Sequence, residues 1–128
     1  NDLKPDVISY NAAMSALRMS GQWEHALVLL SDLQWRGLRP DVASYSAAIS
    51  ACATSGRWKD ALVLLAAMER GGLVPNVKTY SATMSACEKS EQWEVALALL
   101  VRMQRDSLRP DVIAYNAAIS ACEKGKRW

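Results

Sequence analysis

Apolar residues recur along this chain at the spacing of an amphipathic helix, and short polar stretches interrupt them. The first such segment covers about residues 10–17, and the second covers about residues 23–36. Ser9 is a candidate N-cap for the first segment. Gly21 and Gly37 follow the two segments, and a residue without Cβ suits the left-handed conformation that commonly ends a helix. The pattern predicts two helices joined by a short turn, an αα-hairpin.

This two-helix pattern returns with a fixed period along the whole chain. Four residue types recur every 35 positions with no insertion. The columns are Pro5, Pro40, Pro75 and Pro110; Tyr10, Tyr45, Tyr80 and Tyr115; Trp23, Trp58, Trp93 and Trp128; and Val7, Val42, Val77 and Val112. One helix pair cannot bury its own apolar face, so repeated pairs stack on one another. The sequence therefore predicts an all-α fold: a right-handed superhelical α-solenoid of stacked antiparallel helix pairs.

The valine column provides a natural division between repeats. We assign residues 7–41 to repeat 1, 42–76 to repeat 2, 77–111 to repeat 3 and 112–128 to an incomplete repeat 4. Residues 1–6 match the tail of a preceding repeat. We therefore expect the chain to be a stretch of a longer array.

Composition and charge narrow the class of protein only slightly. Apolar residues make up 51% of the chain and charged residues 22%, which is typical of a globular protein. No apolar run reaches the roughly 18 residues that a membrane-spanning helix needs, so we expect no membrane insertion. The net charge of +2 is low for a nucleic-acid-binding domain, so any such function has to rest on geometry.

The cysteines form a fifth column, at Cys52, Cys87 and Cys122. Neighbouring packed helices lie about 8–10 Å apart, beyond the roughly 7 Å that a disulfide can bridge between Cα atoms. We expect the three thiols to be small core residues in a reducing compartment.

Nothing in the sequence indicates catalysis, a metal site or a cofactor. His25 is the one histidine, and Asp60 and Val95 occupy its column in the next repeats. We therefore expect a protein that is not an enzyme. A serine column is expected to donate hydrogen bonds back to the preceding helical turn. Its members are Ser15, Ser50, Ser85 and Ser120.

Two short motifs frame each repeat. The start reads Val-x-x-Tyr-[Asn/Ser]-Ala, as in residues 7–12, and the end reads Leu-x-Pro-[Asp/Asn], as in residues 38–41. Tetratricopeptide repeats have 34 residues and place Trp and Leu-Gly early in the first helix, which does not match. The chain resembles the pentatricopeptide-repeat family, in its uniform 35-residue P-type form. The tryptophan after each turn is a departure that we expect to affect packing rather than binding.

The resemblance implies that the array binds single-stranded RNA and reads about one base per repeat. The specifying pair is the residue after each tyrosine and the last residue of the same repeat. These pairs are Asn11 with Asp41, Ser46 with Asn76, and Ser81 with Asp111, and Asn116 begins a fourth. By the family's recognition rule they favour U, A and G, so the expected core is 5′-U-A-G-pyrimidine-3′. Side chains of this kind offer hydrogen-bond donors and acceptors to base edges. The closing Asp or Asn has an alternative role as a helix cap.

Two further columns complete the site that the resemblance implies. Bases would be held between the residues that follow each valine, namely Ile8, Ala43, Lys78 and Ile113. Of these, the isoleucines suit an aliphatic sandwich, alanine is small, and lysine would have to use its stem or its charge. Phosphates would meet Lys89 and Lys124, whereas Met19 and Thr54 occupy that column earlier.

Three interpretations of the sequence remain open. The leading one is RNA binding in a mitochondrion or plastid, for transcript processing, stability or translation, with the organelle implied by the resemblance alone. The alternative is a structural scaffold of an organellar ribosome or other large complex that binds protein partners. A designed consensus array is disfavoured, because Glu91 and Ser107 stand where glycines would end helices.

Overall fold

Each complete repeat contributes a first helix and a second helix, and the two alternate along the chain. The computed structural model describes residues 6–18 and 22–125. Within these ranges the helices are α1 (Val7–Arg18), α2 (Trp23–Trp35), α3 (Val42–Thr54), α4 (Trp58–Arg70), α5 (Val77–Lys89), α6 (Trp93–Arg105) and α7 (Val112–Gly125). The expected tail of a preceding repeat, apart from Asp6, lies outside the described residues, as do Met19, Gly21 and Trp128. None of the helices in the described ranges is long and apolar enough to cross a membrane.

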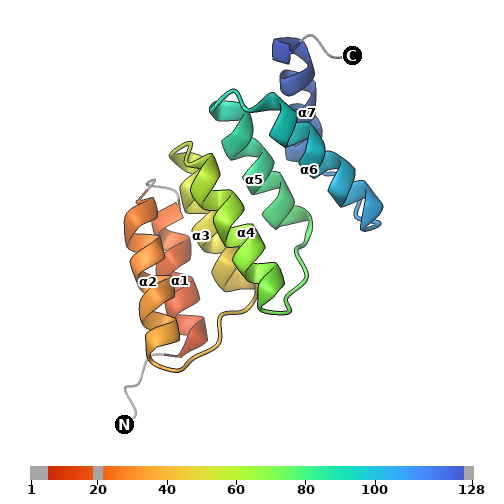
Figure 1. The fold of residues 1–128 in the computed structure, drawn as a ribbon. Helices are drawn as coiled ribbons and strands as arrows, with labels where there is room; N and C mark the ends of the chain where they lie inside the picture. Colours follow the sequence, from red (N-terminus) through yellow and green to blue (C-terminus); the bar gives the residue numbers. More distant parts are fainter. Residues whose placement is uncertain (1–5, 19–21, 126–128) are drawn as a thin grey trace.

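The first helices of the repeats pack side by side in the order α1, α3, α5, α7 (Figure 1). Each second helix packs against the first helix of its own repeat and against that of the next repeat. In the described part of the chain, the backbones of the second helices do not lie side by side, although Glu69 of α4 and Arg102 of α6 form an ion pair. This arrangement is an α-solenoid of helix pairs, which confirms the fold class expected from the sequence.

A carboxylate or amide caps the start of each first helix. Asp41 accepts a hydrogen bond from the Ser44 amide at 3.0 Å and begins α3, and Asn76 accepts one from the Thr79 amide at 3.0 Å and begins α5. At the start of α1 the acceptor is Asp6, which the Ser9 amide contacts at 2.9 Å. The assignment of Ser9 as N-cap is therefore wrong, because the helix already begins at Val7. Such caps satisfy amides that have no partner within the helix.

Left-handed residues end the helices. Gly37 and Gly72 follow the second helices of repeats 1 and 2 with φ of +81° and +85°, and Ser107 takes the same place in repeat 3 with φ of +65°. Glu91 at +60° replaces the glycine that ends a first helix. A side chain in this conformation costs roughly 1–2 kcal/mol. Glu91 and Ser107 therefore carry a backbone cost that glycine would avoid.

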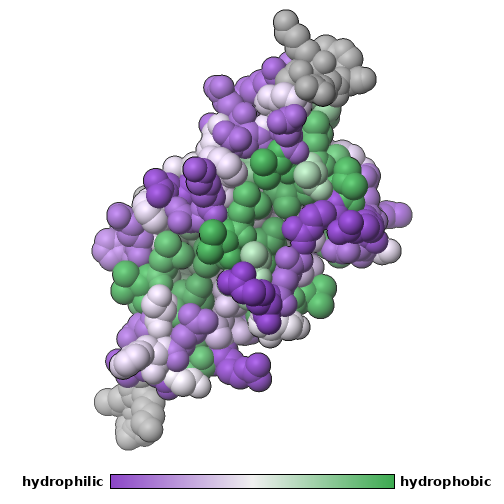
Figure 2. Space-filling view, viewed as in Figure 1, coloured by the Kyte–Doolittle hydropathy of each residue, from purple (hydrophilic) through white to green (hydrophobic). Residues whose placement is uncertain are grey.

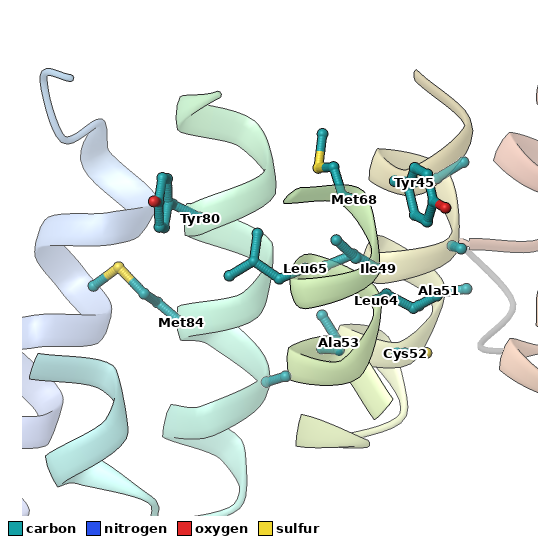
Figure 3. Packing of buried hydrophobic residues seen from close by; sticks show 14 of the residues in the cluster. Tyr45, Ile49, Ala51, Cys52, Ala53, Leu64, Leu65, Met68, Tyr80 and Met84 are labelled. Carbon is teal, nitrogen blue, oxygen red and sulfur yellow. The ribbon is translucent and has the colours of Figure 1, made fainter. Parts of the chain in front are cut away.

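Apolar side chains from both kinds of helix fill the space between repeats. In Figure 3, Leu65 extends from α4 toward α5, on the side of Tyr80 and Met84. All three side chains are almost completely buried. The core is thus continuous along the array, and each repeat contributes to the burial of its neighbours.

Two of the three cysteines lie in this core, as expected, and the third does not. Cys52 and Cys87 are free and buried, and Cys122 is half-buried. Burial raises the pKa of the Cys52 thiol to about 12 and that of Cys87 to about 11. Both thiols therefore stay protonated and act as small apolar residues.

The tryptophan column also packs against the core. Trp23, Trp58 and Trp93 are half-buried. The guanidinium carbon of Arg57 lies 4.2 Å from the centre of the Trp23 ring, which links repeats 1 and 2 through a cation–π contact. These rings are packing residues, in agreement with the sequence analysis.

Two members of the tyrosine column donate their hydroxyls to a carboxylate of the same repeat. The Tyr10 hydroxyl donates to Asp32, and the Tyr80 hydroxyl donates to Asp106 at 3.0 Å. Burial and this second hydrogen bond raise the pKa of Tyr80. The Tyr45 ring is also buried, but its hydroxyl makes no protein hydrogen bond among the described residues and is accessible to solvent. Gly71 occupies the position in repeat 2 that Asp106 occupies in repeat 3.

We expect Gly71→Asp to stabilise the protein by about 1 kcal/mol, because it gives Tyr45 the carboxylate that Tyr80 already has. Gly71 has φ of −80°, close to the −84° of Asp106, so the backbone accepts the side chain. Urea unfolding measures the change. Gly72→Asp is the control, since its φ of +85° strains any side chain. A gain that persists when Tyr45 is also changed to Phe would show that the hydrogen bond is not the cause.

Candidate nucleic-acid interface

The expected readout residues form a single row along the array. Asn11, Ser46, Ser81 and Asn116 occupy equivalent places in the first half of α1, α3, α5 and α7. Because these helices pack in series, the four side chains lie one repeat apart on one side of the solenoid. We call this set the readout row.

Two of the three complete pairs are joined by direct hydrogen bonds. The Asn11 side-chain amide donates to Asp41 Oδ1 at 3.0 Å, and the Ser81 hydroxyl donates to Asp111 Oδ1 at 2.6 Å. The sequence paired these residues across 30 positions, and the structure brings them into contact.

The closing carboxylate uses one oxygen for two tasks. Asp41 Oδ1 accepts from the Ser44 amide and from Asn11, and Asp111 Oδ1 accepts from the Ala114 amide and from Ser81. In both residues Oδ2 has no hydrogen-bond partner within the described ranges. Burial acts to raise the pKa of Asp41, but hydrogen bonds from Ser44 and Asn11 outweigh it, and the pKa lies below its usual value. The Asp41 carboxylate is therefore charged at neutral pH, with one oxygen available to a ligand.

The second pair has a different geometry. Ser46 is only 5% exposed, and its hydroxyl oxygen is buried with no partner in the described part of the chain. Its expected partner, Asn76, accepts the Thr79 cap through Oδ1 and forms no bond to Ser46. An unsatisfied buried hydroxyl costs about 1–3 kcal/mol, so this pair contributes least to stability among the three pairs.

The side chains of the readout row are less exposed to solvent than direct contact with a free nucleotide would require. Ser46 and Ser81 are buried, Asn11 is half-buried and Asn116 is exposed. Ser81 bonds to Asp111 at the start of the next first helix, whereas no described helix follows α7 to cover Asn116. Any base that reaches Ser81 has to do so through a pocket.

Such a pocket exists between repeats 2, 3 and 4. Its volume is about 290 Å³, close to the lower end of the roughly 300–1,000 Å³ range of small-ligand sites. Five residues of the expected site line it together: Lys78, Ser81, Lys89, Asp111 and Ile113. The structure thus brings a readout pair, two sandwich residues and a phosphate lysine to one place.

The sandwich column is exposed throughout. Ile8 and Ile113 are 78% and 55% exposed, and Ala43 and Lys78 also lie at the surface. Ile8 and Ile113 take no part in the core, so their apolar side chains are available to a ligand.

The two phosphate lysines have unequal surroundings. Lys89 lines the pocket and has no ion-pair partner among the described residues. Lys124 lies 3.3 Å from a carboxylate oxygen of Glu88. Thr54, at the same position in repeat 2, lines the pocket but donates its hydroxyl to the Ser50 carbonyl at 3.0 Å.

Sequence reasoning missed part of this lining. Ser50 and Ser85 line the pocket, and neither makes a side-chain hydrogen bond within the described ranges. The expectation that the serine column bonds back to the preceding turn is therefore wrong, because Ser15 and Ser120 make no such bond either within these ranges. Ser50 and Ser85 lie four positions after Ser46 and Ser81, one helical turn away, and this spacing was the available signal.

No group of three or more His, Cys, Asp or Glu residues in the described ranges could hold a metal ion. The polar groups of the interface are amides, hydroxyls, the carboxylates of Asp41 and Asp111, and lysines. This donor and acceptor set suits hydrogen bonding to a ligand rather than metal coordination.

Solved structures similar to this chain include maize PPR10. The crystal structure of that pentatricopeptide repeat protein aligns over 99% of this chain with a TM-score of 0.81 and 26% identity. PPR10 in complex with an 18-nt psaJ RNA element aligns over 94% with a TM-score of 0.83 and 28% identity. The chain spans 18% of the length of PPR10 in both comparisons. The PPR domain of Arabidopsis thaliana protein-only RNase P 1 in complex with tRNA shares the fold, with a TM-score of 0.85, 12% identity and coverage of 98% of this chain and 67% of that one.

Sequence comparisons agree with the structural ones. Among curated proteins, none matches the chain significantly. The family described as PPR repeat family matches residues 5–54 and 40–89, and the PPR repeat matches residues 78–108. These matches cover well over half of the chain, with the period that the columns indicate, and the chain therefore belongs to the pentatricopeptide repeat family.

Proposed function

We propose that this chain binds single-stranded RNA sequence-selectively, reading about one base per repeat of a core 5′-U-A-G-pyrimidine-3′. The observation that carries the proposal is the pocket that unites Ser81, Asp111, Lys78, Ile113 and Lys89. A readout pair, sandwich residues and a cation are the three groups that an unstacked nucleotide requires. Maize PPR10 and the Arabidopsis RNase P domain, both similar in structure, were solved with RNA bound.

The chemistry of this pocket matches guanine. The ring presents N–H donors on its Watson–Crick edge and acceptors at O6 and N7. Asp111 Oδ2 is a free acceptor, and the ammonium groups of Lys78 and Lys89 are donors that line the same pocket. Ile113 supplies an apolar surface for the ring. Adenine would place its N6 amine where a lysine needs an acceptor.

A binding assay tests the proposal. RNA oligomers with the U-A-G-C core should bind about five- to tenfold more tightly than oligomers in which only the third base is changed to A, at the same salt concentration. Fluorescence anisotropy at low salt measures the difference. Equal affinity for both oligomers, and for a scrambled core, would contradict sequence-selective readout by this chain.

We place this activity in a mitochondrion or plastid, in transcript processing, stability or translation, because proteins of this family generally act in organelles. We propose further that this stretch of the array contributes binding rather than catalysis. Fluorescence microscopy of the tagged full-length protein tests the location.

A scaffold role is the second candidate, and the surface of the second helices favours it. The face seen in Figure 2 carries apolar patches that run between polar clusters. The second helices expose Val28, Val63, Val101 and Trp35, which is 88% exposed. Exposed apolar groups of this kind are typical of protein interfaces. Substitution of Trp35 by Ser would weaken a protein assembly and leave RNA affinity unchanged.

A further inference from the structure

An ion pair between repeats lies in the phosphate-contact column. Lys124 Nζ of α7 is 3.3 Å from Glu88 Oε2 of α5, and the two side chains are 48% and 26% exposed. Lys124 is the equivalent, one repeat later, of Lys89. Glu88 directly precedes Lys89 in α5, so the ion pair lies next to the proposed nucleotide pocket.

The same contact is absent one repeat earlier. The residue equivalent to Glu88 is Ala53, which lines the pocket together with Lys89. Lys89 consequently has no carboxylate partner in the described part of the chain, whereas Lys124 has one. Two lysines in one column therefore differ in charge environment because of one residue on the neighbouring helix.

We propose that Glu88 is an affinity-limiting residue that withholds Lys124 from the phosphate backbone of bound RNA. This inference rests on the proposed RNA binding and adds to it a residue outside the expected site. A phosphate at Lys124 has to displace a carboxylate of the same charge sign, which then remains next to the strand. Lys89 meets no such competitor. Glu88 thus lowers affinity without affecting which base is preferred, because phosphate contacts carry no sequence information.

The physical balance favours a measurable effect. A partly exposed ion pair contributes little stability, so the loss of Glu88 does not unfold the array. One additional phosphate contact on a single strand steepens the salt dependence of log affinity by about 0.7. When the salt concentration rises from about 50 to about 200 mM, a protein with this extra contact therefore loses about 2.6-fold more affinity than one without it.

Glu88→Gln is the variant that tests the inference, because it removes the charge and keeps the length and polarity of the side chain. The matched control is Glu69→Gln, which breaks the inter-repeat pair between Glu69 of α4 and Arg102 of α6 and changes the net charge by the same amount. The double variant Glu88→Gln with Lys124→Gln separates a local effect from a general one. RNA affinity is measured at several salt concentrations for U-A-G-C and scrambled oligomers.

We expect Glu88→Gln to tighten binding of both oligomers by about two- to threefold at low salt and to steepen the salt slope by about 0.7. The ratio between the two oligomers should stay constant. The gain should disappear in the double variant and be absent in Glu69→Gln.

Any of three results overturns the inference alone when the wild-type chain binds RNA. In these results, Glu88→Gln leaves the RNA affinity unchanged, Glu69→Gln raises it by as much as Glu88→Gln does, or the gain remains in the double variant with Lys124→Gln. A wild-type chain that binds no RNA at low salt contradicts the proposed function and this inference together.

Discussion

Asn76→Asp should change the preferred second base from A to G, because it converts the Ser46–Asn76 pair into the type of pair that Ser81 and Asp111 form in repeat 3. A preference of about tenfold for A should become one of about tenfold for G, since each base contact is worth about 1–3 kcal/mol. Competition between U-A-G-C and U-G-G-C oligomers measures the shift.

This substitution has a second readout that does not involve RNA. Asp caps α5 as well as Asn does, so the helix start is retained. The new carboxylate also gives the buried Ser46 hydroxyl an acceptor, as Asp111 does for Ser81 at 2.6 Å. We expect a gain of about 1 kcal/mol in the free energy of unfolding. In a Ser46→Ala background this gain should vanish, and a shift in base preference without any change in stability would argue against a contact between Ser46 and the new carboxylate.

Leu65→Ala should lower the free energy of unfolding by about 2–5 kcal/mol, the largest stability effect that we expect from a single change. Leu65 is 1% exposed and extends from α4 toward α5, where repeat 2 meets repeat 3 (Figure 3). In a solenoid the stability depends on contacts between neighbouring repeats, so a cavity here weakens the connection between the two halves. Urea unfolding followed by circular dichroism gives the value.

Val63→Ala is the matched control for this prediction. Val63 lies on the same helix two residues earlier but is 62% exposed, so its truncation should change stability by less than about 0.5 kcal/mol. Similar losses for Leu65 and Val63 would mean that the α4–α5 contact does not stabilise the array.

The 35-residue periodicity allowed the fold to be predicted from the sequence. Columns of Val, Tyr, Trp and Pro at 35-residue spacing predict where each helix pair recurs, and the spacing of apolar residues within each repeat predicts that the elements are helices. The observed bounds of α2, Trp23–Trp35, agree with the expected segment to within one residue. The cap of α1 is not decided by the sequence, because Ser9 and Asp6 are both good capping residues and only the backbone distinguishes them.

The candidate site was less predictable because it depends on contacts between repeats. Pairing of Asn11 with Asp41 followed from the family resemblance, but the burial of Ser46 depends on where the next helix begins. The Glu88–Lys124 contact joins residues 36 positions apart, one more than the repeat length, so no column reveals it. Side-chain direction across neighbouring helices determines such contacts, and a linear pattern does not contain it.

The closing residue of each repeat also limits how the array can evolve. Asp41, Asn76 and Asp111 each hold the first turn of the next helix, so a mutation there is tested first for folding and only afterwards for recognition. Asp, Asn, Ser, Thr and Gly are the residues that begin helices well. Retargeting by point mutation is thus easiest within this small set of replacements, because most other changes at these three positions would also cost about 1 kcal/mol of stability.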